Sequence, residues 1–147
     1  MQYVAFLTKA GARTEVEFPD APGCHGLAER GEPVLGVAKE ALEGWLEAHL
    51  VEGPRRVPRA PRKNHRVPRG AQSIVVTVDP ILAAKVALRR ARLARELTQE
   101  QLARRLGIKQ AQVAKLENPD FPSTLLSLKK AADALDADVD INIELRD

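Results

Sequence analysis

The segment 54–70, PRRVPRAPRKNHRVPRG, restricts the fold of this chain more than any other stretch. It contains four prolines, seven lysines and arginines, and no acidic residue. Proline disrupts helices, and closely spaced charges cannot be buried in a core. Helices and strands must therefore form on either side, within residues 1–53 and 71–147. Three interpretations of the segment remain open: a nonspecific DNA clamp, a contact to an acidic partner, or a charged flexible spacer.

The residues before this segment predict a sheet covered by one helix. Residues 2–8 and 13–18 read as strands joined by a turn at Gly11, and residues 27–30 could add a third strand. Apolar residues then recur every three or four positions from about Pro33 to Glu52, which predicts an amphipathic helix. Residues 73–79 return as a strand. We therefore expect an α+β domain with β-β-β-α-β order over residues 1–79.

Charge is distributed unevenly along the chain. Residues 1–53 carry 4 basic and 9 acidic residues, whereas residues 85–115 carry 9 basic and 2 acidic ones. This split predicts two parts with different partners, the second of them a nucleic acid. The single cysteine excludes an internal disulfide framework, and no apolar run approaches the length of a membrane span. We expect a cytoplasmic protein without a membrane partner.

The run 97–117, LTQEQLARRLGIKQAQVAKLE, predicts two short helices joined by a tight turn. Thr98 and Gln101 fit a capping box, and Gly107 can take the left-handed conformation that ends the first helix. Two such helices form a helix-turn-helix, whose second helix can enter the major groove of DNA. The alternative is a helical bundle with solvated basic faces, which does not require this order of capping and turn residues.

This run resembles the helix-turn-helix of the Cro and phage-repressor family, over about residues 88–135. The resemblance implies a phosphate contact by Gln99, base contacts by Gln110, Ala111 and Lys115, and an internal pair between Glu117 and Arg92. One departure is the following loop, NPDFPS, where Asp120 would repel a phosphate. The full set of expected DNA-binding residues is Gln99, Lys109, Gln110, Ala111, Gln112 and Lys115.

The tail of this second domain, residues 80–147, alternates apolar and polar residues over 139–145, VDINIEL. The alternation predicts a short C-terminal strand with one apolar face. The strand could complete a sheet within the chain or pair across a two-fold axis. We favour pairing, because a helix-turn-helix usually needs a second half-site about 34 Å away. The expected assembly is a homodimer or a higher even oligomer.

The stretch 18–26, FPDAPGCHG, places Cys24 beside His25 and close to Asp20. Adjacent residues on a strand point to opposite faces, so the pair cannot share a proton as a catalytic nucleophile and base. No histidine or cysteine spacing suggests a zinc site, and Asp20 is the only carboxylate near a strand end. The sequence thus predicts a turn without catalysis, metal or cofactor, shaped by Pro22 and Gly23, with Cys24 buried.

This turn and the acidic helix after it resemble the N-terminal domain of the HicB antitoxin family, as does the junction 74–107. The resemblance implies a partial ribonuclease-H-like fold that has lost catalysis and that binds HicA, a small basic RNA-cleaving toxin. It also implies repression of the operon that encodes both proteins. The alternative is a stand-alone transcription regulator whose N-terminal domain senses a ligand or protein. The expected toxin contacts are Phe18, Asp20, Glu40, Glu43 and Glu47.

Overall fold

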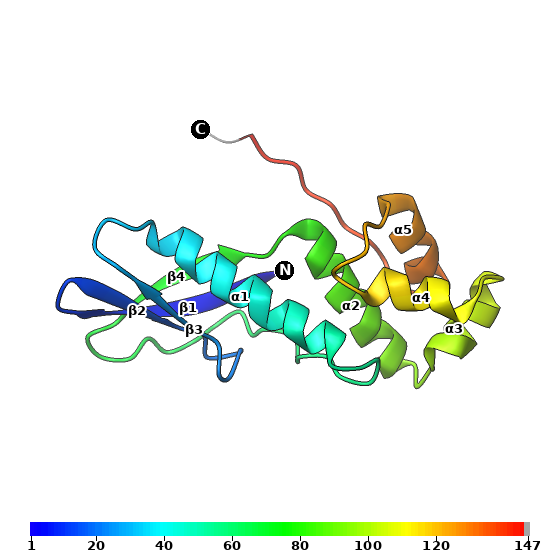
Figure 1. The fold of residues 1–147 in the computed structure, drawn as a ribbon, viewed down its shortest axis with the longest axis horizontal. Coiled ribbons are helices and arrows are strands. Elements are labelled where there is room, and N and C mark those ends of the chain that lie inside the picture. The colour runs from blue at the N-terminus through cyan, green and yellow to red at the C-terminus, as the bar shows by residue number, and fades with distance from the viewer. Residues whose placement is uncertain (146–147) are drawn as a thin grey trace.

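A computed structural model describes residues 1–145; residues 146–147, the end of the expected second domain, lie outside this part. A sheet with one covering helix packs end to end with a group of short helices, giving an elongated molecule (Figure 1). The elements in chain order are β1 Gln2–Ala10, β2 Arg13–Glu17, β3 His25–Ala28, α1 Val34–Val51, β4 Gln72–Thr77, α2 Pro80–Ala94, α3 Gln99–Leu106, α4 Gln110–Glu117 and α5 Leu125–Asp133.

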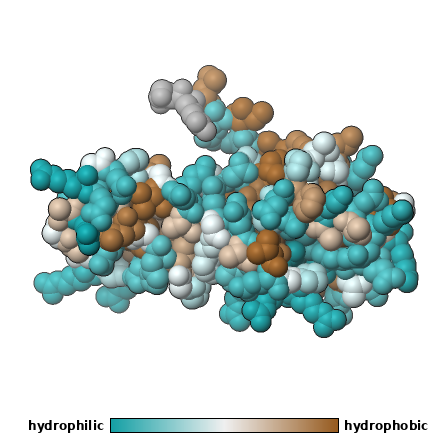
Figure 2. Space-filling model, in the orientation of Figure 1, coloured by the Kyte–Doolittle hydropathy of each residue, from teal (hydrophilic) through white to brown (hydrophobic). Residues whose placement is uncertain are grey.

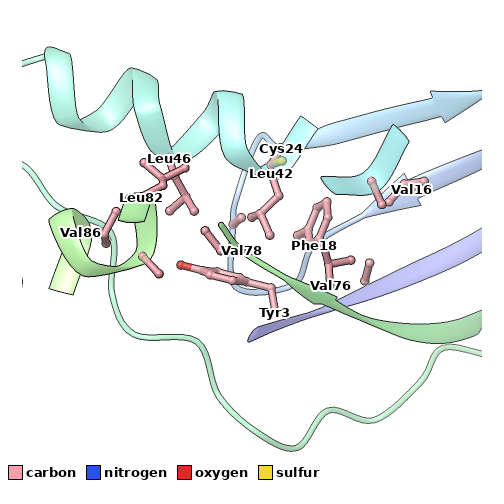
Figure 3. Packing of buried hydrophobic residues seen from close by; sticks show 14 of the residues in the cluster. Tyr3, Val16, Phe18, Cys24, Leu42, Leu46, Val76, Val78, Leu82 and Val86 are labelled. Atoms are coloured by element: carbon pink, nitrogen blue, oxygen red, sulfur yellow. The ribbon is translucent and has the colours of Figure 1, made fainter. Parts of the chain in front are cut away.

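The sheet is antiparallel throughout, with strand order β3-β2-β1-β4. Register pairs Leu7 with Val16 and Tyr3 with Val76, so the alternate residues of the central strands share one face. That face is buried under α1, which contributes Leu42 and Leu46 to the same core (Figure 3). The mixed α/β composition and the β-β-β-α-β order of the first part are those that the sequence predicts.

Two details of the sheet differ from the sequence prediction. The third strand begins at His25, immediately after the turn, because Glu17 of β2 pairs with His25. The first core also extends past Asp79 into the next helix: Leu82, Ala83 and Val86 of α2 pack with the sheet. Leu88, farther along α2, packs instead with the core of α3, α4 and α5. One helix is thus shared by both cores across the boundary expected at residue 79.

The C-terminal tail corrects another prediction, because residues 138–145 form no strand in the described part of the chain. The tail leaves the end of the helical bundle and runs back above it as a single extended segment (Figure 1). Its apolar side chains are exposed, with Ile143 at 91% and Leu145 at 99% of full exposure. Figure 2 shows the tail as a segment with exposed apolar surface, coloured brown. A lone strand has no partner for its backbone hydrogen bonds, so alternation alone does not produce a sheet.

Candidate nucleic-acid interface and its anchoring to the sheet

The helix-turn-helix has the local geometry that its sequence predicts. The Thr98 hydroxyl accepts a hydrogen bond from the Gln101 backbone N–H at 3.1 Å, and the Gln101 side chain accepts one from the Thr98 N–H at 2.8 Å. This capping box fixes the start of α3. Gly107 ends α3 with a φ of 66°, in the left-handed region that glycine adopts without strain. The turn then sends α4 across α3.

The second helix, α4, exposes the residues expected to face DNA. Its inner face buries Val113 and Leu116. The residues expected to face DNA, in α4 and at its N-cap, are solvent-exposed: Lys109, Gln110, Ala111, Gln112 and Lys115. Among them, the Gln112 side chain accepts the Lys109 backbone N–H at 2.9 Å and so caps the helix. The Lys115 ammonium lies 5.4 Å from the Phe121 ring centroid, a cation–π contact that holds this side chain toward the following loop.

Gln99, the expected phosphate contact, is nearly buried between α4 and the core. Its residue is only 9% exposed, and its side-chain amide bridges two neighbours. The amide nitrogen donates to Glu117 Oε2 at 3.0 Å, and its oxygen accepts from Gln110 Nε2 at 2.8 Å. The side chain of Gln99 therefore positions Gln110, and its expected contact to a phosphate stays a prediction.

Glu117, at the end of α4, is the centre of a buried charge network. It is 0% exposed and accepts hydrogen bonds from Arg92 Nε at 2.5 Å and from Arg89 Nε at 2.9 Å, besides the one from Gln99. Burial raises the pKa of this carboxyl, but hydrogen bonds from Arg92 and Gln99 and the arginine charges outweigh it, so the net pKa is lowered. Glu117 is thus held ionised in the core. The Arg92 partner follows the sequence expectation, whereas Arg89 was missed.

Arg89 connects this network to the first part of the molecule. Its Nη1 donates to the carbonyl oxygens of Leu50 at 2.8 Å and Gly53 at 2.9 Å, at the C-terminal end of α1. Carbonyls at a helix C-terminus lack intrahelical partners and attract a cation. One buried guanidinium therefore joins the end of α1 to the end of α4. The sequence signal was the three- to four-residue spacing of basic residues Lys85, Arg89 and Arg92 on α2.

Lys85 gives α4 a second support. This buried ammonium donates to the carbonyl oxygens of Lys115 and Leu116, each at 3.2 Å, and to Ser123 Oγ at 2.7 Å. Burial lowers the pKa of Lys85. Its position satisfies two carbonyls in the last turn of α4, which have no partner within the helix. The helix α4 is thus held from α2 by both lysine and arginine side chains.

The basic segment 54–70 is anchored at several points. Near its beginning, Arg92 Nη2 donates to the Pro54 carbonyl, and Arg90 Nη2 donates to the Pro58 carbonyl at 2.9 Å. Farther along, Asp20 accepts hydrogen bonds from the Arg62 backbone N–H and from His65 Nε2, each at 2.7 Å. A free spacer would not make these contacts. The segment is therefore packed along α2 and the 18–24 turn.

Asp20 and Phe18 are placed differently from the expected toxin surface. Phe18 is buried in the core (Figure 3). Burial raises the pKa of Asp20, but the hydrogen bonds from Arg62 and His65 outweigh it and lower the pKa overall. Phe18 thus packs inside the core, and the Asp20 carboxylate is hydrogen-bonded to residues of the basic segment. The burial of Phe18 argues against its expected toxin contact, whereas the contact expected of Asp20 stays a prediction.

The acidic residues of α1 have two different environments. Glu40 and Glu47 are exposed. Glu43 is half-buried, and its Oε1 accepts the Asp79 backbone N–H at 2.7 Å, which fixes the junction between β4 and α2. Only Glu40 and Glu47 are therefore fully available to another protein, while Glu43 is a structural residue with one exposed edge.

The turn at Cys24 contains no reactive thiol. Gly23 has a φ of 82°, and Trp45 Nε1 donates to the Pro22 carbonyl at 3.2 Å, so the turn docks on α1. Cys24 is buried there, with its Sγ 3.4 Å from the Ala41 carbonyl oxygen. Burial raises the pKa of the thiol to about 11, which leaves little thiolate for nucleophilic attack.

No group of three or more histidine, cysteine, aspartate or glutamate side chains within residues 1–145 is arranged to hold a metal ion. In the same part of the chain, no helix combines the length and apolar character needed to cross a membrane.

Comparison with known proteins identifies the C-terminal part. Residues 88–142 match the helix-turn-helix family, which confirms the sequence prediction for this region. A chain in a solved structure described as "HicA3 and HicB3 toxin-antitoxin complex" is similar with 28% sequence identity, covering 54% of this chain and 100% of that chain, at a TM-score of 0.47. A search of curated proteins found no match.

Proposed function

We propose that this chain is the antitoxin of a type II toxin-antitoxin pair, which binds a HicA-like RNA-cleaving toxin and represses its own operon. The proposal is carried by a β-β-β-α-β arrangement followed by a helix-turn-helix in one chain. Residues 88–142 match the helix-turn-helix family, and the turn and helix of the first part resemble the HicB family in sequence. The first unit would be a ribonuclease-H-like domain without catalysis. Cys24, with its raised pKa, and Asp20, bound by Arg62 and His65, leave no reactive group in its turn.

Operator recognition would use the exposed face of α4. Gln110, held by Gln99 at 2.8 Å, can pair bidentately with adenine, and Ala111 can contact a thymine methyl group. Lys115 can reach guanine or a phosphate. Because Gln99 fixes the orientation of Gln110 before DNA arrives, less side-chain entropy is lost on binding. Two copies of the chain, bound at half-sites one helical turn apart, would supply specificity.

Toxin binding would use the outer face of α1. Glu40 and Glu47 are exposed there, seven residues apart and thus on one side of the helix. Residues 1–53 carry 4 basic and 9 acidic residues, so this region attracts a basic partner. Complementary charge accelerates association and disfavours wrong partners. An RNA-cleaving enzyme carries positive charge where it binds RNA, and covering that surface would inhibit it.

The antitoxin role is tested by co-expression: we expect the reading frame beside the gene to encode a small basic protein, and we would express it with and without this protein. We expect the neighbour to be toxic alone, and to be neutralised in a stable complex with this protein. Glu40→Lys with Glu47→Lys should weaken the complex, while Glu15→Lys with Glu17→Lys, exposed on β2, should not. A neighbour that is harmless, or that forms no complex, would refute the antitoxin role.

The DNA role is tested separately by removing two groups from α4. Gln110→Ala with Lys115→Ala should abolish specific binding to the DNA upstream of the gene and leave toxin binding intact. The matched control is Gln2→Ala with Lys9→Ala, which removes the same two residue types from exposed positions on β1. Specific binding that survives the α4 substitutions would refute recognition through this helix.

A further inference from the structure

The basic segment begins beside the DNA-facing helix, although the two are far apart in the sequence. Arg92 donates to the Pro54 carbonyl with one part of its guanidinium and to Glu117 with the rest. Glu117 in turn accepts from Gln99, which holds Gln110. A continuous chain of hydrogen bonds therefore runs from Pro54 to the residue expected to read bases. Figure 1 shows the same proximity: the segment leaves α1 next to the C-terminal end of α2.

The backbone of the segment is oriented so that its arginine side chains face solvent. Carbonyl oxygens of Gly53, Pro54, Arg56 and Pro58 all accept hydrogen bonds from arginines of α2, at distances up to 3.2 Å. The guanidinium groups of α2 therefore bind the backbone of the segment on the side that faces α2. Three side chains of the segment remain exposed on its outer side: Arg55, Arg56 and Arg59.

The exposed arginines carry charge that the chain itself hardly neutralises. Arg56 pairs with Glu52, but this pair is at the surface and the Arg56 side chain is 72% exposed, so the pair is weak. Within residues 1–145, no ion pair involves Arg55 or Arg59. The loop that follows α4, residues 118–123, lacks such cations: it contains Asp120 and no lysine or arginine.

From this placement we infer that Arg55, Arg56 and Arg59 form a second contact to the DNA phosphate backbone, adjacent to the helix-turn-helix and held in place by α2. The inference rests on the DNA binding proposed above. A duplex seated on α4 carries one negative charge per about 1.7 Å of its axis, so its backbone extends beyond the groove that α4 occupies. Guanidinium groups fixed beside that groove can bind phosphates without first ordering a loop. This function makes the N-terminal half of the segment part of the repressor surface.

An alternative polyanion is single-stranded RNA, because Arg55, Arg56 and Arg59 also line a groove of about 870 Å³ together with Trp45 and His49. Aromatic rings beside arginines can stack bases. However, Trp45 donates its indole N–H to Pro22 and its ring packs against His49 at 4.2 Å between centroids. The N–H edge and one ring face of Trp45 are therefore already in contact with other residues of the chain. The start of the segment lies beside α4, and this position favours duplex DNA.

The test measures how DNA affinity depends on salt. Binding of the full-length protein is titrated by fluorescence anisotropy at several NaCl concentrations. The two probes are a duplex from upstream of the gene and a random duplex of equal length. The test variant is Arg55→Gln/Arg56→Gln/Arg59→Gln. The control is Lys63→Gln/Arg66→Gln/Arg69→Gln, which removes three exposed cations from the half of the segment that runs away from the helical bundle (Figure 1).

Each phosphate contact contributes about 0.9 to the slope of log affinity against log salt. We expect the test variant to lose roughly 2 to 3 units of slope on both duplexes, and the control variant to lose less than about 1. The single substitution Arg55→Gln, at a side chain without an ion pair, should lose about 0.9 and guards against an effect of misfolding. A slope equal to that of the parent overturns the inference, as does a loss equal to the control's.

Two further outcomes separate this inference from the proposed function. If the parent protein binds neither duplex, the proposed DNA role fails and the inference fails with it. If the parent binds DNA and the test variant binds it unchanged, but loses affinity for the neighbouring toxin or for a single-stranded RNA of equal length, only the inference is overturned. The arginines would then serve the other partner.

Discussion

Replacing Glu117 by glutamine tests whether the buried charge network holds the molecule together. The substitution keeps the size of the side chain and removes its charge. At pH 7, Arg89 and Arg92 would then be buried without a counter-ion. Removing one partner of a buried ion pair typically costs 3–5 kcal/mol. Both arginines retain backbone carbonyl partners, at Leu50 and Leu97 among others, so we expect a loss near the lower limit, about 3 kcal/mol.

This loss should be visible in both parts of the molecule. For a chain of this size, about 3 kcal/mol corresponds to a decrease in Tm of roughly 6–12 °C. Trp45, the only tryptophan, lies on α1 and reports the first core by fluorescence, while far-UV circular dichroism is dominated by the helices. Because Arg89 joins α1 to Glu117, the two midpoints should decrease together. A surface control, Glu100→Gln, removes an exposed pair with Arg104 and should cost no more than about 0.5 kcal/mol.

The pH dependence gives a second check on the same residue. The folded-state pKa of Glu117 is lowered, so its charge stabilises the fold fully above the unfolded pKa of about 4.3. This contribution is lost as the pH falls through the lower folded pKa. The difference between parent and Glu117→Gln should therefore be constant from pH 6 to 7, and should shrink below about pH 4. A loss under about 1 kcal/mol at pH 7, or one that does not change in acid, would refute the argument.

Three further predictions concern the turn and the tail. Asp20→Asn should speed tryptic cleavage within residues 54–70, because the turn then loses its charged bond to Arg62; fragment mapping against Asp120→Asn checks this, and equal rates would count against the anchor. Native Cys24, with a pKa of about 11, should react with a disulfide reagent at pH 8 only slowly, and far faster in urea; a fast native reaction would contradict its burial. Deleting residues 138–147 should convert dimers to monomers in sedimentation with little change in Tm, whereas an unchanged dimer would exclude pairing through the tail.

Local patterns were sufficient to predict the elements whose stability depends on neighbouring residues. The capping box at Thr98 and the glycine turn at Gly107 require only residues within one helical turn, and both are present in the structure. The helix α1 follows from apolar positions at helical spacing, with Leu42 and Leu46 in its buried face. The strands β1, β2 and β4 likewise follow from alternation, with boundaries within a few residues of those predicted.

Contacts between distant segments were not predictable in the same way. Arg89 reads as one more exposed cation on a basic helix, since arginines are seldom buried without a partner. Its partners are backbone carbonyls at Leu50 and Gly53, 39 and 36 residues before it, and a carboxylate at Glu117, 28 residues after it. No local pattern encodes carbonyl partners, because every residue has a carbonyl. The same reason explains why the proline- and arginine-rich segment seemed free, although α2 holds it through such groups.

The shared role of α2 limits which substitutions can separate the two proposed activities. Its first half belongs to the core of the sheet, its second half to the core of the helix-turn-helix, and Arg89 joins the ends of α1 and α4. A change at Arg89 or Glu117 therefore disturbs the supports of both α1 and α4, the helices proposed to bind the toxin and DNA. Loss of both activities in such a variant would show only that the support has failed. Substitutions at exposed side chains, Glu40 with Glu47 or Gln110 with Lys115, leave this support intact and can therefore assign each activity to its own surface.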